Sequence, residues 1–249
     1  PANYLSYGVF NENGDGTSKL FPSGVMLNGT LSNLDQSQIR EYLGRSWFSS
    51  ASGMHPYQGD TTPDTSKLDA YSWLKAPRYG TNVMQVGPLA RVMVAYLRGT
   101  NSAINTLVPW LLTQTGRTVA DLNSVMGRHA TRALECKIIA DRCEDWVNAL
   151  VPGATAFTTF TIPSSAAGMG LTEAARGALG HWMQLTGGLV SRYQCVVPTT
   201  WNASPRDELG QAGAMEQSLV GTPIASESSP IEDVRVVRSF DPCLSCAVH

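Results

Sequence analysis

The stretch Thr118-Val-Ala-Asp-Leu-Asn-Ser-Val-Met-Gly-Arg-His-Ala-Thr-Arg-Ala-Leu-Glu-Cys-Lys-Ile-Ile-Ala-Asp-Arg-Cys-Glu-Asp-Trp-Val-Asn-Ala-Leu-Val-Pro-Gly153 decides the fold class. Asp121, three residues after Thr118, makes a variant of the capping box, and Pro152-Gly153 stops the helix. Between these signals a stripe recurs every three or four residues, the period of one helix face. We expect this stripe to pack inside a helical bundle: Val125, His129, Cys136, Ile139, Cys143, Trp146 and Leu150.

Two further helices are predicted upstream. Pro88 suits the first turn of a helix, and a second helix spans about Ala103–Thr113, so residues 87–152 are predicted to form the bundle. Residues 1–86 are predicted to be irregular and peripheral. They contain loops and short strands up to residue 35, a short helix that begins at Asp35, and a polar loop over residues 50–70.

The remaining residues, 153–249, combine short strands with clustered motifs. Alternating patterns predict strands over residues 154–162, 190–197 and 234–237. The segment Thr172–Ala175 predicts a turn-like entry that places a side chain at a buried site. The predicted fold class is therefore α+β and predominantly helical, with a helical bundle core and small peripheral β elements.

The composition excludes several classes of protein. With 18 Lys and Arg against 20 Asp and Glu, the net charge of −2 argues against a surface for nucleic acid. No apolar run is long enough to span a membrane, and the start lacks the pattern of a signal peptide. Only 15% of the residues are charged, which predicts that much surface is buried against a partner.

The last nine residues, Asp241-Pro-Cys-Leu-Ser-Cys-Ala-Val-His249, concentrate soft metal ligands. Cys243 and Cys246 are three positions apart, so both sulfur atoms can reach one metal ion from a single turn. Metal binding is the favoured interpretation, and a redox dithiol or a structural disulfide are the alternatives. A complete metal site needs further ligands from elsewhere.

The other thiols and imidazoles have plainer interpretations. Five cysteines make a poor disulfide framework, so thiols that are reduced or bound to metal are expected. Cys136 and Cys143, one heptad apart, are predicted to be buried free thiols. His55, His129 and His181 invite a role in proton transfer. His129 is favoured as a hydrogen-bonded core or interface residue. His181, which adjoins Trp182 just after the segment with Arg176, is favoured as a packing residue around the site.

Four motifs accompany the tail. They are Ser72-Trp-Leu-Lys-Ala-Pro-Arg-Tyr79, Val86-Gly-Pro-Leu-Ala-Arg91, Gly168-Met-Gly-Leu-Thr-Glu-Ala-Ala-Arg-Gly-Ala-Leu-Gly-His-Trp182 and Tyr193-Gln-Cys-Val-Val-Pro-Thr-Thr-Trp-Asn-Ala-Ser-Pro-Arg-Asp207. These motifs, in this order, make the sequence resemble the large subunit of nickel–iron uptake hydrogenases. The resemblance covers nearly the whole chain.

The resemblance implies a C-terminal half of such a subunit. Members of the family are about twice this length, and a maturation endopeptidase cuts them after the terminal histidine, so His249 is expected to be a processed end. The implied partners are the N-terminal half with a second Cys-x-x-Cys pair and an iron–sulfur small subunit, and the chain is expected to pack against both. The implied location is periplasmic, or membrane-associated through the small subunit, with the cytoplasm as an alternative.

The resemblance also assigns a nickel–iron centre with carbon monoxide and cyanide on the iron. Cys243 matches a terminal nickel ligand that can serve as a base, and Cys246 matches a bridging ligand. Arg176 matches an arginine over the open face of the centre, where Asp241 is expected to hold it. Thr199 matches a hydroxyl that bonds a cyanide.

A second metal, magnesium or iron, is implied at a distal site. His249 and the backbone carbonyl of Cys195 match its ligands, and Lys75 is expected to join the water network there. Ala175 stands where relatives commonly have proline, which leaves more room around the diatomic ligands of the iron.

The implied function is reversible heterolytic cleavage of dihydrogen, with the electrons passed to the iron–sulfur clusters of the small subunit. The alternative is a subunit that senses dihydrogen with little turnover. A third class, the relative in respiratory complex I that has lost its cysteines, is disfavoured because Cys243 and Cys246 are present.

Overall fold

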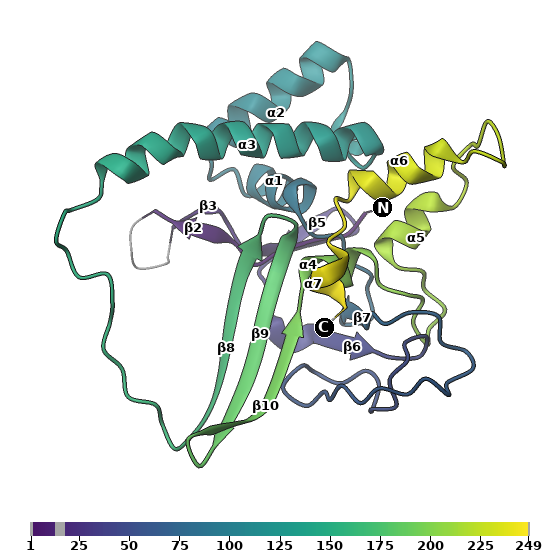
Figure 1. Ribbon diagram of the computed structural model, residues 1–249. Helices are drawn as coiled ribbons and strands as arrows, with labels where there is room; N and C mark the ends of the chain where they lie inside the picture. The colour runs from purple at the N-terminus through teal and green to yellow at the C-terminus, as the bar shows by residue number, and fades with distance from the viewer. Residues whose placement is uncertain (1, 13–17, 249) are drawn as a thin grey trace.

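The computed structural model describes residues 2–12 and 18–248 (Figure 1). The strands are β1 (Tyr4–Ser6), β2 (Val9–Asn11), β3 (Lys19–Phe21), β4 (Gly24–Leu27), β5 (Thr30–Ser32), β6 (Ile39–Tyr42), β7 (Ala76–Tyr79), β8 (Ser165–Ala174), β9 (Gly177–Thr186) and β10 (Leu189–Val196). The helices are α1 (Pro88–Arg98), α2 (Ser102–Thr115), α3 (Val125–Asn148), α4 (Pro198–Asn202), α5 (Ala214–Leu219), α6 (Ile231–Ser239) and α7 (Leu244–Ala247), with short 3₁₀ turns η1 (Gln36–Gln38) and η2 (Val119–Leu122).

The α+β fold class is confirmed, with a modest excess of helix: 33% of the structure is helical and 24% lies in strands. The expectation of small β elements was too narrow. β8, β9 and β10 form an antiparallel sheet in the order β10-β9-β8, and two of its strands are ten residues long. The other sheets are small, with the orders β1-β4-β5, β2-β3 and β6-β7.

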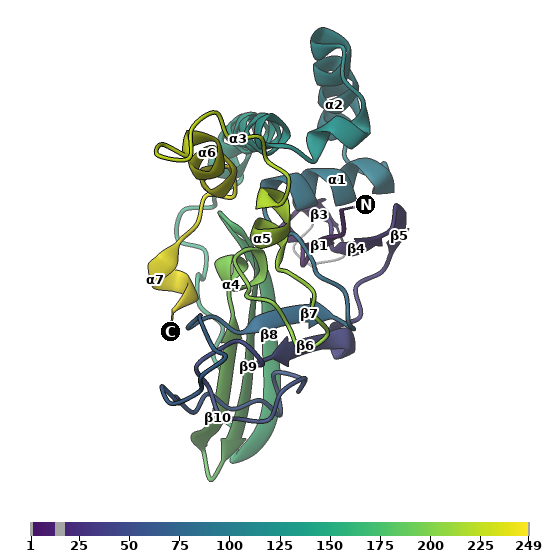
Figure 2. The ribbon, with the colours of Figure 1, turned by 90° about the vertical axis from the view of Figure 1, so that its right-hand side faces the viewer.

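Helix α1 is the centre of the hydrophobic core. Pro88 occupies its first turn, as predicted, and Gly99 ends it in the left-handed conformation at φ 66°. The helix packs between α3 on one side and β1 on the other, and nearly all of its residues are buried (Figures 1 and 2). A second apolar cluster beneath it, around Trp182 and Trp201, joins the β8–β10 sheet to α4.

Helix α3 is present, and the capping box between Thr118 and Asp121 precedes it. The predicted buried stripe was right only in part, because Val125, Ile139 and Trp146 pack partly buried against the core. His129, Cys136 and Cys143 are exposed. The fully buried residues of α3 instead mix polar with apolar and small ones: Gly127, Arg128, Thr131, Leu134, Glu135 and Ile138. The buried face of α3 is rotated from the predicted one because charged side chains can be buried where an ion pair or an aromatic ring compensates them. Arg128, for example, lies over the Phe240 ring at 3.8 Å.

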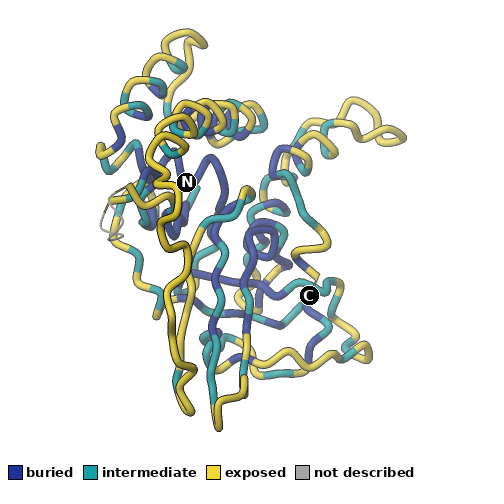
Figure 3. Tube along the Cα trace, turned by 60° about the vertical axis from the view of Figure 1, so that its left-hand side comes forward, coloured by how far each residue is buried: buried dark blue, intermediate teal, exposed yellow. Residues whose placement is uncertain are grey.

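Three predictions of secondary structure require correction. Residues 154–162 form no regular structure, because no neighbouring strand pairs with them. Residues 234–237 lie in α6, whose first turn carries Glu232 and Asp233, acidic residues that favour a helix start. After Asp35 only the turn η1 is helical, and the chain then enters β6. Figure 3 shows the chain from the end of α3 through β8 exposed along most of its length.

The described residues include no helix with the length and apolar character needed to cross a membrane.

Candidate metal centre

The two cysteines of the tail lie at α7, a single turn beside α4 (Figure 2). In the structure Cys243 and Cys246 are joined as a disulfide, one of the alternatives for this pair, and their role as metal ligands stays a prediction. Spacing of three on one turn brings their Cα atoms to 5.4 Å, within the range that a disulfide spans. A metal requires the reduced, thiolate form of the pair.

Arg176 lies at the turn between β8 and β9 and reaches back to the tail. Its Nε donates to the carbonyl oxygen of Asp241 at 2.7 Å, and its Nη2 donates to the carboxylate at 3.2 Å. Asp241 adopts φ 54°, a left-handed conformation uncommon for residues other than glycine. Two bonds to one residue fix the guanidinium plane beside the start of α7.

The β8–β9 turn is a two-residue loop, Ala175-Arg176, because Ala174 pairs with Gly177. The predicted turn at Thr172–Ala175 was therefore placed too early, and Thr172 lies within β8. Gly177 has φ 133°, and a Cβ there would lie 2.5 Å from the backbone nitrogen of Gly87. Glycine is required at this position because the hairpin turn approaches the start of α1 so closely.

Arg91 of α1 holds the same turn from the other side. Its Nη1 and Nη2 donate to the carbonyl oxygens of Ala174 and Ala175, each at 2.9 Å. Nη1 also donates to Glu173 at 2.7 Å, and Nη2 to Glu135 at 2.8 Å. Burial raises the pKa of Glu173, against the opposing pull of Arg91. This buried network fixes the backbone from which the Arg176 side chain extends.

Thr199 connects α4 to the tail. Its Oγ1 accepts a hydrogen bond from the backbone nitrogen of Cys243 at 3.1 Å, and the residue is 2% exposed. Its hydroxyl hydrogen has no acceptor among the residues that the structure describes. The threonine is thus positioned next to the cysteine pair with one donor left to offer a ligand.

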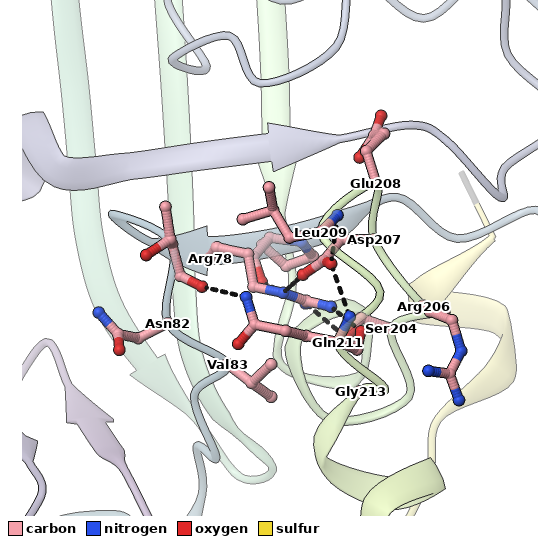
Figure 4. A network of polar contacts seen from close by, with 12 residues as sticks. Arg78, Asn82, Val83, Ser204, Arg206, Asp207, Glu208, Leu209, Gln211 and Gly213 are labelled. Atoms are coloured by element: carbon pink, nitrogen blue, oxygen red, sulfur yellow. Dashed lines mark hydrogen bonds and ion pairs between the residues drawn. The ribbon is translucent and has the colours of Figure 1, made fainter.

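Arg78 and Asp207 join the first and last of the four motifs (Figure 4). Nε of Arg78 donates to Oδ2 of Asp207 at 2.6 Å, and both side chains are fully buried. The same guanidinium donates to the Ser204 hydroxyl at 2.9 Å and to the carbonyl of Gln211 at 3.2 Å. The bonds set the loop that follows α4.

Asn202 gives the second link between motifs. Its side-chain carbonyl accepts from the nitrogen of Val86, and its amide donates to the oxygen of the same residue, at 3.0 and 3.1 Å. These contacts hold the start of α1 against α4. The four motifs, which are dispersed over more than 130 residues, are therefore joined to one another, and two of them contact the tail through Arg176 and Thr199.

A cavity of about 270 Å³ lies between β10, α7 and the loop before β7. Lys75 lines it, with Nζ 2.7 Å from the Gln194 side chain and 3.6 Å from the Glu41 carboxylate. Cys195 also lines it, and burial, followed by the nearby Glu41 charge, raises the pKa of its thiol. The cavity has oxygen donors and a buried cation, and it borders Ala247 of the tail.

The remaining candidates are placed as follows. Ala175 is exposed, with its carbonyl bonded to Arg91. His181 bonds Tyr193 on the sheet face opposite Trp182, and His55 bonds Gln36. His249 lies outside the described residues. Cys136 and Cys143 are exposed rather than buried, and neither is in a disulfide.

The donor set fits half of a metal centre. Residues 2–12 and 18–248 contain no group of three or more His, Cys, Asp or Glu side chains placed to hold a metal ion. Cys243 and Cys246 provide two soft donors on one turn, and Cys246 and Leu244 are exposed, so the pair is open to ligands from outside these residues.

Comparison with known proteins agrees with this arrangement. The family model described as nickel-dependent hydrogenase matches residues 1–249. The chain belongs to the nickel-dependent hydrogenase family. It is 38% identical to the hydrogenase-1 large chain of Escherichia coli, with 98% of this chain and 47% of that protein aligned. It is 37% identical to the uptake hydrogenase large subunit of Rhizobium leguminosarum, over 99% of this chain and 48% of that protein.

The solved structures give the same result. A reduced, active form of the Ni-Fe-Se hydrogenase from Desulfomicrobium baculatum superimposes with a TM-score of 0.89 at 38% identity, covering 99% of this chain and 52% of that chain. The chain spans about half the length of the hydrogenase large subunits it matches.

Sequence reasoning missed the charged residues that position this site. Glu173, Glu135, Arg78 and Asp207 were not singled out, although all four side chains are almost completely buried. One signal was available. In a chain with only 15% charged residues, a glutamate or arginine within an apolar, glycine-rich motif is a candidate for a buried ion pair.

Proposed function

We propose that this chain is the part of a nickel–iron hydrogenase large subunit that carries half of the catalytic centre, and that the assembled enzyme cleaves dihydrogen reversibly into protons and electrons. One observation carries the proposal: in a chain that matches the hydrogenase family over its whole length, Arg176 and Thr199 from two distant motifs contact the tail segment that carries Cys243 and Cys246.

Cys243 and Cys246, once reduced, would hold the nickel–iron pair together with two thiolates from the other half of the subunit. When bound there, such a centre, with carbon monoxide and cyanide on its iron, would supply the hydride acceptor for dihydrogen. The thiolate sulfur of Cys243 would be placed to take the proton, because a base next to the reacting molecule lowers the barrier to heterolysis. That sulfur lies at the start of α7, where Thr199 holds its backbone.

Arg176 orients and polarises what enters the centre. Asp241 anchors its guanidinium through Nε and Nη2, and Nη1 makes no hydrogen bond with the described residues. A planar donor that is always charged is suited to electrostatic stabilisation of a developing charge. Thr199 could offer its hydroxyl hydrogen to a cyanide on such an iron, and Ala175 would leave space beside the diatomic ligands.

The cavity beside α7 is the proposed distal metal site, for magnesium or iron. The backbone carbonyl of Cys195 and the imidazole of His249 would be ligands, and Lys75 with its partners Gln194 and Glu41 would hold the surrounding water. Such hard oxygen donors suit magnesium. The remaining ligands would come from the other half of the subunit.

The proposed partners are that other half, with its own Cys-x-x-Cys, an iron–sulfur small subunit that takes the electrons, and an endopeptidase that matures the end at His249. One relative is named a periplasmic [NiFeSe] hydrogenase large subunit and another an uptake hydrogenase large subunit. On this basis we propose an uptake enzyme that is periplasmic or is associated with the membrane through its small subunit, with the cytoplasm as the alternative.

The decisive experiment is Cys243→Ser in the assembled enzyme, with nickel measured by elemental analysis and the iron ligands by infrared stretches of carbon monoxide and cyanide. Nickel is expected to be lost. Ser245→Ala, on the same turn, is the control and should keep full loading. Full nickel content in Cys243→Ser would refute the ligand assignment. Full metal content with little turnover in the unaltered enzyme would favour dihydrogen sensing instead.

A further inference from the structure

Helix α3 has a second apolar face that no element of the described residues covers. Seven of its residues follow a strict alternation of three and four positions, and all seven are exposed: Met126, His129, Ala133, Cys136, Ala140, Cys143 and Val147. We call these residues the α3 outer stripe. Met126 is 72% exposed and Val147 is 65% exposed.

The spacing of this stripe is a heptad pattern. Alternation of three and four positions gives a period of 3.5, which keeps a seam in contact with another helix over its whole length. The stripe covers 21 residue steps from Met126 to Val147, or about 32 Å at ~1.5 Å per residue. The core face of α3 is separate, because Leu134 and Ile138 are buried in the hydrophobic cluster that includes residues of α1.

The sizes of the side chains in the α3 outer stripe indicate which side chains a partner helix needs. The middle of the stripe is small, with Ala133, Cys136, Ala140 and Cys143, while Met126 and Val147 mark its ends. Small residues let two helix axes approach toward ~8 Å and leave holes for larger side chains of the neighbour. A groove of about 560 Å³ continues the apolar surface at the Met126 end, between η2 and the end of α2, and Leu111 and Leu122 line it.

We propose that the α3 outer stripe is the seat of a long helix from the half of the large subunit that has no counterpart in this chain. The relatives are about twice as long as the chain, so an equal length of polypeptide is available to supply that helix. The helix would carry leucine, isoleucine or phenylalanine at its heptad positions opposite Ala133 to Cys143. This inference rests on the assembly proposed above.

The reactivity of the Cys136 and Cys143 thiols measures whether a helix covers the stripe, and this measurement does not depend on enzyme activity. In the assembled enzyme, Cys136 and Cys143 are expected to react with a maleimide at least tenfold more slowly than a cysteine introduced by Asp145→Cys. Asp145 lies on the same helix, is exposed, and is outside the stripe. Equal labelling rates at all three positions would overturn the proposal.

A cross-link identifies the occupant. Met126→p-benzoylphenylalanine in the assembled enzyme, irradiated and analysed by peptide mass spectrometry, is expected to attach to a helix from the rest of the large subunit. Attachment to a second copy of this chain, or to the small subunit, would contradict the proposal. Asp145→p-benzoylphenylalanine is the matched control and should give no such product.

Assembly yield and thiol labelling test the helix contact, whereas nickel content tests the proposed function, so the two proposals can fail independently. Ala140→Glu is expected to lower the yield of assembled enzyme at least tenfold, whereas Asp145→Glu should leave it unchanged. A loss of nickel in Cys243→Ser with the labelling pattern intact would support both proposals. Protected thiols in an enzyme that keeps nickel after Cys243→Ser would refute the ligand assignment alone.

Discussion

Arg78 and Asp207, 129 positions apart, form an ion pair from which solvent is completely excluded, with Nε and Oδ2 2.6 Å apart. Removal of both charges from water is costly, and their attraction offsets that cost only while both are present. The pair therefore contributes more to the geometry of the loop after α4 than to net stability.

Loss of one partner should be severe. Asp207→Asn leaves the Arg78 guanidinium buried and uncompensated, so the free energy of unfolding is expected to fall by about 3–5 kcal/mol. Urea unfolding followed by circular dichroism measures it. Asp69→Asn, which breaks the exposed pair with Arg45, is the control and should change little. Similar small effects in both variants would show that the buried pair is dispensable.

Gly177→Ala should disturb the site through the backbone. The added Cβ would lie 2.5 Å from the nitrogen of Gly87 and 2.7 Å from Val86, at a φ of 133° that alanine rarely adopts. We expect a loss of stability of at least ~1–3 kcal/mol, together with reduced activity, since Arg176 is the adjacent residue. Gly168→Ala, where a Cβ meets nothing within 4 Å, should be tolerated. A stable Gly177→Ala variant would mean that the turn can move.

Arg176→Lys tests the electrostatic role of the guanidinium. Lysine keeps the charge but loses the two-point contact with Asp241, so both metals should remain while turnover falls about 10²-fold or more. Hydrogen uptake by dye reduction gives the rate, and elemental analysis gives the metal content. Arg192→Lys, at the pair with Asp60, provides the comparison and should retain activity. Near-normal turnover in Arg176→Lys would remove Arg176 from the mechanism.

His55 makes stability depend on pH. Burial lowers the pKa of His55, against the raising effect of its hydrogen bond to Gln36. Between that lowered pKa and 6.5, the unfolded state binds more protons than the folded state. The contribution is thus fully present above about pH 6.5 and is lost as the pH falls. Unfolding measured at pH 7.5 and pH 5 should show a smaller decline in His55→Gln than in the unaltered protein. An identical decline would assign the effect to other groups.

The sequence indicated the position of the candidate site better than the packing around it. Local motifs in the sequence pointed to the tail cysteines, Arg176 and Thr199. The structure places Arg176 and Thr199 in contact with the tail. The pairing of Arg78 with Asp207 depends on the register of distant segments, which no local pattern carries. Whether Cys243 and Cys246 form a disulfide depends on their redox state, which the spacing of the two residues in the sequence does not indicate.

Helix α3 shows why the assignment of its core face failed. The long helix was predicted, but it begins later than expected: the capping box at Thr118 caps η2, and Ser124 caps α3 itself. Its buried face combines Leu134 and Ile138 with the charged Arg128 and Glu135, whose charges are compensated by Phe240 and Arg91 on other elements. The residues of the α3 outer stripe are exposed. A periodicity method detects the apolar face, but it does not show which neighbour covers it.

The β8–β9 hairpin has one constrained end and one open end. Gly87, Gly177 and Arg91 hold the Ala175-Arg176 turn tightly, while the far end meets β10 through Gly187 and Gly188, around which a Cβ would meet nothing within 4 Å. Within this chain, an affinity tag or a fluorophore inserted at Gly187–Gly188 would sit a full strand length from the arginine. That remote loop is therefore a practical attachment point for immobilising the protein on an electrode or a bead.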